Sequence, residues 1–113
     1  MPEISAFTIR PFALDTDLPT LARLLADVEA TDQEGEDVGE ATLRDLFAAF
    51  GATRTDGRWV ALAPDDPARF IGWGSVWQMP GATEANIQVA VHPAWRRRGL
   101  GGVLLARVLI GLR

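Results

Sequence analysis

Apolar residues recur along this chain at two spacings, one typical of helices and one typical of strands. Between residues 18 and 28 they recur every three or four positions, which makes one apolar stripe along a helix. Residues 15–17 (Asp-Thr-Asp) precede that stripe as candidate N-cap residues, and Pro19 falls early in the first turn. A second stripe occupies residues 43–50, and Gly51 follows it where a C-terminal cap belongs. The pattern therefore predicts two consecutive helices, separated by an acidic loop over residues 31–40.

Four further segments are predicted to be strands. Residues 7–12 and 85–91 alternate apolar and polar side chains, whereas residues 59–63 form a short apolar run suited to a strand buried on both faces. Residues 69–78 make a longer strand, which the turn at 64–67 joins to the preceding one as an antiparallel hairpin. Perfect alternation would give this strand one face with Ile71, Trp73, Ser75 and Trp77, and another with Phe70, Gly72, Gly74 and Val76. The two glycines indicate a bend or a close approach to the backbone.

The last predicted element is a helix over residues 100–113 that is apolar on nearly every side. Only Arg107 and Arg113 interrupt its apolar positions, so it needs cover on nearly every side. The order strand, helix, helix, three strands, helix indicates an α/β layered fold, with helices packed on a mixed, mostly antiparallel sheet. At 113 residues the chain is the size of one small domain, spanning residues 1–113.

Composition excludes several classes of site and partner. The chain has no Cys and a single His, which rules out disulfides, thiolate chemistry and Cys-rich or His-rich metal sites, and we expect no metal. A formal charge of −4 gives the whole molecule no attraction for nucleic acid or anionic lipid. No segment approaches the ~20 apolar residues of a membrane span, and the first residues lack a signal-peptide pattern. A cytoplasmic protein without nucleic-acid or membrane partners is the expectation.

Against this acidic background, residues 91–102 (VHPAWRRRGLGG) stand out as an anion-binding loop. They join the end of the last strand to the start of the last helix. A helix N-terminus leaves amide N–H groups unpaired and carries partial positive charge. Gly99, Gly101 and Gly102 leave room for a ligand to reach those amides, and residues 96–98 add three arginines. The combination suits phosphate oxygens, whereas the lysine-containing phosphate-loop motif and the dinucleotide-binding GxGxxG are both absent.

This loop resembles the acetyl-coenzyme A signature of the GNAT superfamily of N-acetyltransferases, Gln/Arg-x-x-Gly-x-Gly/Ala after a strand that often ends in Val-x-Pro. Residues 96–101 (RRRGLG) match the signature and residues 91–93 (VHP) match the lead-in. The order of elements is also similar to that of the family. The resemblance covers the whole chain at the level of architecture, and it is specific in sequence from about residue 87 to about residue 109.

The resemblance implies a role for each matching position. The amides of about Arg97 to Gly102 (Arg97, Arg98, Gly99, Leu100, Gly101, Gly102) would bind the pyrophosphate of acetyl-coenzyme A (acetyl-CoA), beside Arg96. Val89 and Val91 would lend backbone groups to the pantetheine arm, and an amide near Val89 would polarise the thioester carbonyl. A small-molecule or peptide primary amine would attack directly in a ternary complex, and Glu84, at the start of the fourth strand, is the candidate base. Asn86 with an ordered water is its rival.

The chain departs from the family pattern after the third helix. The family continues with a fifth strand, a fourth helix and a closing pair of strands, and the fourth helix often carries a Tyr that protonates the leaving thiolate. This chain has no such segment and no Tyr. The alternative to an active acetyltransferase is therefore a catalytically incomplete module that binds CoA or assembles through its last helix, as a homodimer or with a missing C-terminal half.

Other residues have a plain structural interpretation beside a functional one. His92 is a turn residue or a catalytic one, and the arginines bind a cofactor or are solvated surface charges. The acidic residues 32–40 form a solvated loop or attract a cationic amine. Trp73 and Trp77 pack in the core or line a substrate site.

Overall fold

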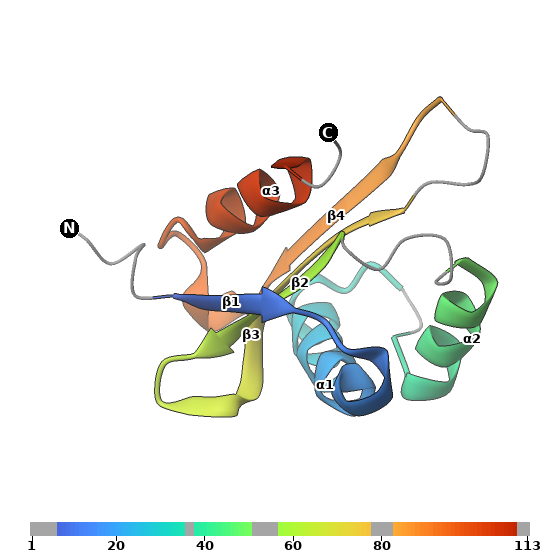
Figure 1. Cartoon of the computed structure of the whole chain (residues 1–113). Coiled ribbons are helices and arrows are strands. Elements are labelled where there is room, and N and C mark those ends of the chain that lie inside the picture. The colour runs from blue at the N-terminus through green and yellow to red at the C-terminus, as the bar shows by residue number, and fades with distance from the viewer. Residues whose placement is uncertain (1–6, 36–37, 51–56, 78–82, 111–113) are drawn as a thin grey trace.

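The computed structural model describes residues 7–35, 38–50, 57–77 and 83–110. It contains the seven predicted elements in the predicted order, together with a short 3₁₀ helix before the last one (Figure 1). Their bounds are β1 Thr8–Pro11, α1 Leu14–Asp32, α2 Glu40–Phe50, β2 Arg58–Ala63, β3 Asp66–Trp77, β4 Asn86–Val91, η3 Pro93–Trp95 and α3 Leu100–Ile110. The described part of the chain excludes three features used above: the predicted cap Gly51, the side chain of Trp77, and Arg113.

The four strands form one sheet in the order β1-β2-β3-β4, and every neighbouring pair is antiparallel. The α/β prediction is confirmed, and within the described residues the sheet is antiparallel throughout. Strands β2 and β3 form its centre, whereas β1 and β4 are its edges. None of the described helices is both long enough and apolar enough to cross a bilayer.

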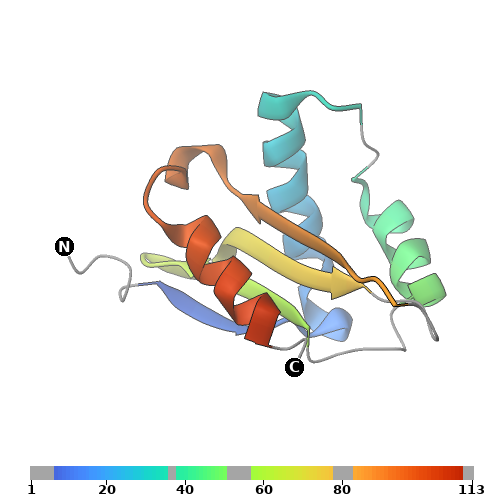
Figure 2. The same ribbon diagram turned by 90° about the horizontal axis from the view of Figure 1, so that it is seen from above.

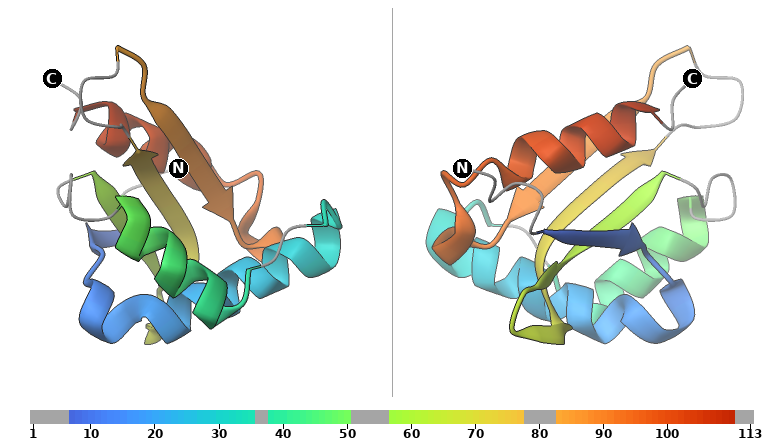
Figure 3. Two further views of the ribbon diagram at one scale, coloured as in Figure 1. Left: turned by 90° about the vertical axis from the view of Figure 1, so that its right-hand side faces the viewer. Right: turned by 60° about the vertical axis from the view of Figure 1, so that its left-hand side comes forward.

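Helices cover both faces of this sheet. Helices α1 and α2 lie on one face and α3 lies on the other (Figures 2 and 3). The side chains divide accordingly into two buried clusters, one under α1 and α2 and one under α3. The sheet is thus the middle of three layers, and β4 forms one of its edges.

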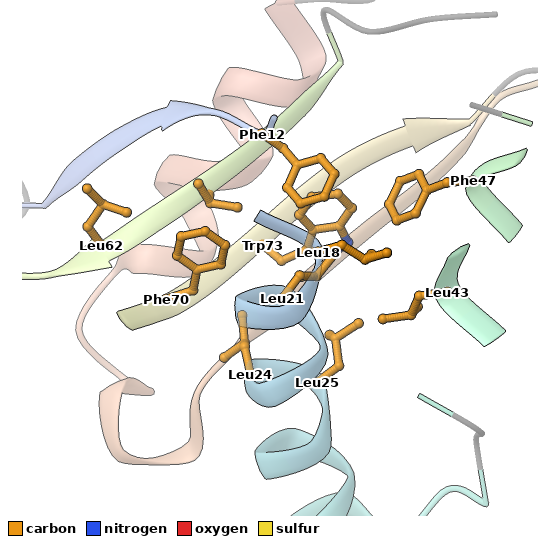
Figure 4. Packing of buried hydrophobic residues seen from close by; sticks show 11 residues of the cluster. Phe12, Leu18, Leu21, Leu24, Leu25, Leu43, Phe47, Leu62, Phe70 and Trp73 are labelled. Atoms are coloured by element: carbon orange, nitrogen blue, oxygen red, sulfur yellow. The ribbon is translucent and has the colours of Figure 1, made fainter. Parts of the chain in front are cut away.

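The larger cluster is built around three aromatic rings from different elements (Figure 4). Phe12 stacks on Phe47 of α2 with ring centroids 5.3 Å apart, and it meets Trp73 of β3 edge-on at 5.0 Å. The leucine stripe of α1 completes the cluster, as its spacing predicted, with Leu18, Leu21 and Leu24 each at most 2% exposed. Trp73 is 1% exposed, so the core interpretation of this residue is confirmed.

The smaller cluster depends on the two glycines of β3. A Cβ atom at Gly72 would lie 2.7 Å from Cδ1 of Leu104, and one at Gly74 would lie 3.0 Å from Cγ2 of Val108. The first separation is too short for a real Cβ atom and the second is unusually tight, so the side chains of α3 would have to move to make room. The predicted close approach to the backbone is therefore confirmed, and the approaching element is α3.

The predicted faces of β3 are wrong at Ile71, because the strand contains a bulge there. Ala61 pairs with Gly72 but Leu62 pairs with Phe70, which leaves Ile71 as an extra residue opposite β2. The bulge puts Ile71 in the α3 cluster and Phe70 in the α1 cluster, the reverse of simple alternation. Trp73 and Gly72 lie on opposite faces of the sheet, as simple alternation predicts.

The first helix begins earlier and ends later than its sequence pattern indicated. Ala13 is the N-cap residue and makes no side-chain cap, so the predicted capping by residues 15–17 is wrong. Asp17, which lies inside the helix, bonds to the N-cap residue instead: its Oδ2 accepts a hydrogen bond from the backbone amide of Ala13 at 2.8 Å. At the other end α1 includes Thr31 and Asp32, which shortens the predicted acidic loop. Asp32 is thereby held on the last turn of a helix.

Candidate functional site

The free edge of β4 exposes backbone groups at alternate residues. The amide of His92 donates to the carbonyl of Ile71 at 2.9 Å, and directly opposite residues in an antiparallel pair alternate between bonded and non-bonded pairs. Ala90 and Gln88, opposite Trp73 and Ser75, continue the bonded set. The N–H and C=O groups of Ile87, Val89 and Val91 therefore point away from β3, towards the side where no described strand pairs with β4.

The chain after β4 turns sharply into α3. η3 follows His92, and then Arg97 and Gly99 adopt positive φ angles of 66° and 84°. Val103 is the first residue of α3 whose amide finds a partner, the carbonyl of Gly99 at 3.2 Å. The amides of Leu100, Gly101 and Gly102 have no hydrogen-bond partner among the described residues, as expected at a helix N-terminus.

Nothing in the described structure requires glycine at positions 101 and 102. A Cβ atom at Gly101 would meet only Cγ2 of Val91, at an ordinary 3.7 Å, and one at Gly102 would meet nothing within 4 Å. Glycine in a helix is unfavourable by roughly 0.8–1 kcal/mol relative to alanine. Two such residues beside unpaired amides leave open space in which an anion can approach the backbone.

Arg96 joins this loop to the last turn of α1. Its two terminal nitrogens donate to both carboxylate oxygens of Asp32 at 3.0 and 2.9 Å, and its Nε donates to the carbonyl of Val91 at 3.1 Å. The hydrogen bonds from the guanidinium lower the pKa of Asp32, and those to the carboxylate raise the pKa of Arg96. Arg96 thus holds the end of β4 and the helix together.

His92 makes a second link to α1. Its Nδ1 accepts the amide of Ala94 at 3.1 Å, and its Nε2 lies 3.2 Å from Oδ2 of Asp27. With Nδ1 as acceptor, the ring proton sits on Nε2 and is donated to Asp27. The residue therefore begins a turn, as predicted, and also orients the loop.

The other two arginines differ from Arg96. The guanidinium of Arg98 lies 4.8 Å from the ring centre of Trp95, a cation–π contact that leaves its N–H groups available. Arg97 and Arg98 are both exposed beside the unpaired amides. Together these features give the 97–102 segment exposed positive charge beside unpaired N–H donors, a combination that suits a polyanion such as a pyrophosphate.

A cavity of about 570 Å³ lies on the α1 side of β4. We call it the α1/β4 cavity. Its lining comprises Leu21, Leu25, Val28, Glu29, Asp32, Glu34, Val38, Leu43, Leu46, Phe47, Trp73, Gln88, Val89, Ala90, Val91 and Arg96. Strand β4 therefore forms a wall of this cavity and leads along the chain into the 97–102 segment.

Comparison with known proteins agrees with this geometry. A family model described as "Acetyltransferase (GNAT) domain" matches residues 6–109. The chain belongs to the GNAT acetyltransferase family. No curated protein sequence was found to match it.

Solved structures share this GNAT fold. An acetyltransferase of the GNAT family from Staphylococcus aureus Mu50 superposes with a TM-score of 0.69 at 12% identity, over 93% of this chain and 64% of its own. PH1933 from Pyrococcus horikoshii OT3 superposes with a TM-score of 0.65 at 20% identity, over 92% of this chain and 69% of its own. The present chain thus spans 64% of the length of the first structure.

The fold of the present chain brings together most of the candidate site residues that the sequence singled out. Val89, Val91 and residues 96–102 form one continuous stretch from the β4 edge to the first turn of α3. Glu84 is exposed, lies two residues before β4, and is not among the residues that line the α1/β4 cavity. Asn86 is the exposed first residue of the strand.

Sequence reasoning missed the position of Glu29 beside the cavity and the pairing of Asp32 with Arg96. Glu29 was only a polar residue beside the leucine stripe, yet it lines the cavity, and its Oε2 accepts the amide of Gly35 at 2.7 Å. Asp32 was assigned to a loop. Its partner Arg96 is 64 positions away, and no local pattern marks such a pair.

Proposed function

We propose that this GNAT chain binds acetyl-CoA and acts as an N-acetyltransferase, in which a primary amine attacks the thioester directly within a ternary complex. The observation that carries the proposal is the free β4 edge leading into a helix start with unpaired amides and unobstructed glycines. Family membership supports acetyl transfer in general.

The residues present suit a coenzyme A ligand in two separate ways. The amides of Leu100 to Gly102 and the side chains of Arg97 and Arg98 supply N–H donors and positive charge for the pyrophosphate. The outward-facing groups of Val89 and Val91 offer an edge to which an amide-containing arm can hydrogen-bond as an added strand. The carbonyl of Val91 already accepts a hydrogen bond from Arg96, so the carbonyl of Val89 is the more available of the two for a ligand.

The chemistry then needs a proton acceptor. Acetyl-CoA would supply an activated acyl group, so that a C–N bond forms as the C–S bond breaks. An alkyl ammonium has a reference pKa of about 10.4, and a base must remove a proton before nitrogen can attack. Glu84 is our candidate for that base, with Asn86 and an ordered water as the rival, and the amide of Val89 is the candidate donor to the carbonyl oxygen.

The proposal is tested by release of free thiol from acetyl-CoA in the presence of a panel of primary amines. We expect amine-dependent release, and we expect Glu84→Gln to lower kcat about 100-fold with little change in KM. Asp65→Asn, in the β2–β3 turn, is the matched control. Saturation with acetyl-CoA and no turnover of any amine would contradict the enzyme proposal, whereas turnover that survives Glu84→Gln would overturn only the choice of base.

A second candidate function is a CoA-binding or assembly module without catalysis. The observation that favours it is the outer side of α3, where Leu105, Leu109 and Ile110 are 40%, 45% and 61% exposed. Such a surface suits a second copy or another chain. Light scattering tests it: a dimer is expected, and a strict monomer together with amine turnover would exclude it.

A further inference from the structure

We propose that the α1/β4 cavity binds the acceptor, and that this acceptor is a primary amine carried on an apolar alkyl or aryl group. This inference rests on the proposed acetyl transfer, because it names the class of amine that the reaction would use. Three properties of the cavity carry it: an apolar floor, an acidic rim, and a wall formed by β4.

The floor of the cavity is apolar and closely packed. Leu21, Leu25, Leu43, Phe47 and Trp73 reach it from the core, and each is at most 7% exposed in the folded chain. The polar atom of Trp73, its indole Nε1, already donates to Oε1 of Gln88 at 3.2 Å. A hydroxyl group placed against these leucine and phenylalanine side chains would lose its water without gaining a partner, whereas a hydrocarbon group would bury favourably.

The rim of the cavity carries an excess of negative charge. Among the described residues, three carboxylates (Glu29, Asp32 and Glu34) and one guanidinium (Arg96) line it, which leaves two net negative charges. Arg96 neutralises Asp32 through the bidentate pair, so the excess belongs to Glu29 and Glu34. Opposite charge near a cleft raises the local concentration of a cation, and a free primary amine is cationic at neutral pH.

The position and size of the cavity suit an acceptor. Val89, Ala90 and Val91 of β4 form one wall, and the same strand leads into the 97–102 segment where we place the cofactor. About 570 Å³ is within the range of small-molecule sites. A cationic head at the rim with a hydrocarbon body on the floor matches both surfaces, whereas polyhydroxylated amines match only the rim.

The test is a titration of the whole chain with hexylamine, butylamine and 6-aminohexan-1-ol, followed by calorimetry and by amide chemical shifts. Each buried methylene strengthens binding about fourfold, so we expect hexylamine, which has two more methylenes, to bind about 15-fold more tightly than butylamine. The terminal hydroxyl of 6-aminohexan-1-ol should weaken binding at least about fivefold relative to hexylamine. The shifted amides should belong to α1, α2 and β4.

Two variants with matched controls locate the site. Leu46 lines the cavity at 43% exposure, and Leu109 on the opposite face of the sheet is 45% exposed. Leu46→Ser should weaken hexylamine binding about three- to tenfold while Leu109→Ser leaves it unchanged. Glu34→Gln should weaken hexylamine and 6-aminohexan-1-ol equally, about threefold, and Asp65→Asn should affect neither.

The proposal is overturned if hexylamine and 6-aminohexan-1-ol bind equally, if Leu46→Ser has no effect, or if the shifted amides lie outside α1, α2 and β4. None of these outcomes depends on turnover. A separate titration with acetyl-CoA distinguishes the two claims. Normal acetyl-CoA binding with no preference among the amines would contradict the acceptor class alone. Selective amine binding without acetyl-CoA binding would contradict the proposed function and leave the cavity as an amine site.

Discussion

A glycine inside a helix or strand weakens it by roughly 0.5–1 kcal/mol relative to alanine, so its presence has to be explained by what lies beside it. Gly72 and Gly74 are explained by the packing of α3 against β3. Gly101 and Gly102 have no such explanation within the described chain, because a Cβ at either position finds ordinary or open space. Gly72 and Gly74 are therefore explained by packing within the fold, whereas we attribute Gly101 and Gly102 to the binding of a ligand.

This difference predicts opposite effects of the same substitution. Gly102→Ala should raise the free energy of unfolding by about 0.5–1 kcal/mol, yet weaken acetyl-CoA binding about tenfold by crowding the amides. Gly72→Ala should lower the free energy of unfolding by about 1–3 kcal/mol because Leu104 must move. Urea denaturation and calorimetry measure the two quantities. A Gly102→Ala protein with unchanged affinity would remove the ligand explanation for that residue.

Asp17 gives a residue-scale prediction about stability and pH. It is 6% exposed, and it accepts two hydrogen bonds from Arg10 at 2.7 and 2.9 Å and one from the amide of Ala13. The bonds from Arg10 chiefly, and that from Ala13, lower the pKa of Asp17. Asp17→Asn should therefore reduce the free energy of unfolding at pH 7 by about 1–3 kcal/mol.

The pH dependence has a definite sign. A carboxyl whose folded-state pKa lies below its unfolded value of about 3.9 stabilises the protein above that value, and the contribution is lost as pH falls through the folded-state pKa. The stability difference between wild type and Asp17→Asn should therefore be constant near neutral pH and shrink below about pH 4. A difference that persists undiminished in acid would show that the charge is not its source.

At the scale of elements, two side-chain links tie the β4–α3 loop to α1. Arg96 pairs with Asp32 and His92 contacts Asp27, so successive turns of one helix hold both ends of η3. Arg96 also holds the carbonyl of Val91. The signature arginine thus acts here by positioning the loop, while Arg97 and Arg98 remain exposed for an anion.

Breaking the first link should loosen the loop without unfolding the chain. Asp32→Asn should speed hydrogen exchange in residues 96–102 and weaken acetyl-CoA binding by a factor of about two to five. The matched control is Glu40→Gln, which disrupts the 2.8 Å pair with Arg44 on α2. Equal effects of the two substitutions on the loop amides would contradict a positioning role for Asp32.

The apolar pattern predicted the type and order of the four strands and three α-helices, but it did not predict the short 3₁₀ helix η3. It failed where tertiary contacts override the period. The bulge at Ile71 reverses the faces of Phe70 and Ile71, and only pairing with β2 reveals it. The start of α1 was also misplaced, since Asp17 satisfies the amide of Ala13 from inside the helix rather than from the N-cap position.

At the scale of the whole molecule, α1 and α2 cover one face of the sheet and α3 covers the other (Figure 1). Strand β4 lines the α1/β4 cavity and leads along the chain into the 97–102 segment, so it connects the two candidate ligand sites. The cofactor hypothesis for residues 96–102 could be formed from the sequence because these residues are contiguous. The α1/β4 cavity was not, because its lining comes from α1, α2, β3 and β4, and residues as distant as Asp32 and Arg96 meet only after folding.

The most direct test of the account is calorimetric titration of this chain and its Gly101→Glu variant with acetyl-CoA. The variant should fold normally, because a side chain at position 101 meets only Val91 at van der Waals distance. Wild type should bind one molecule per chain, and the variant should show no binding, because a carboxylate would occupy the place proposed for the pyrophosphate. Equal affinities of the two proteins would contradict the assignment of residues 97–102 as the cofactor site.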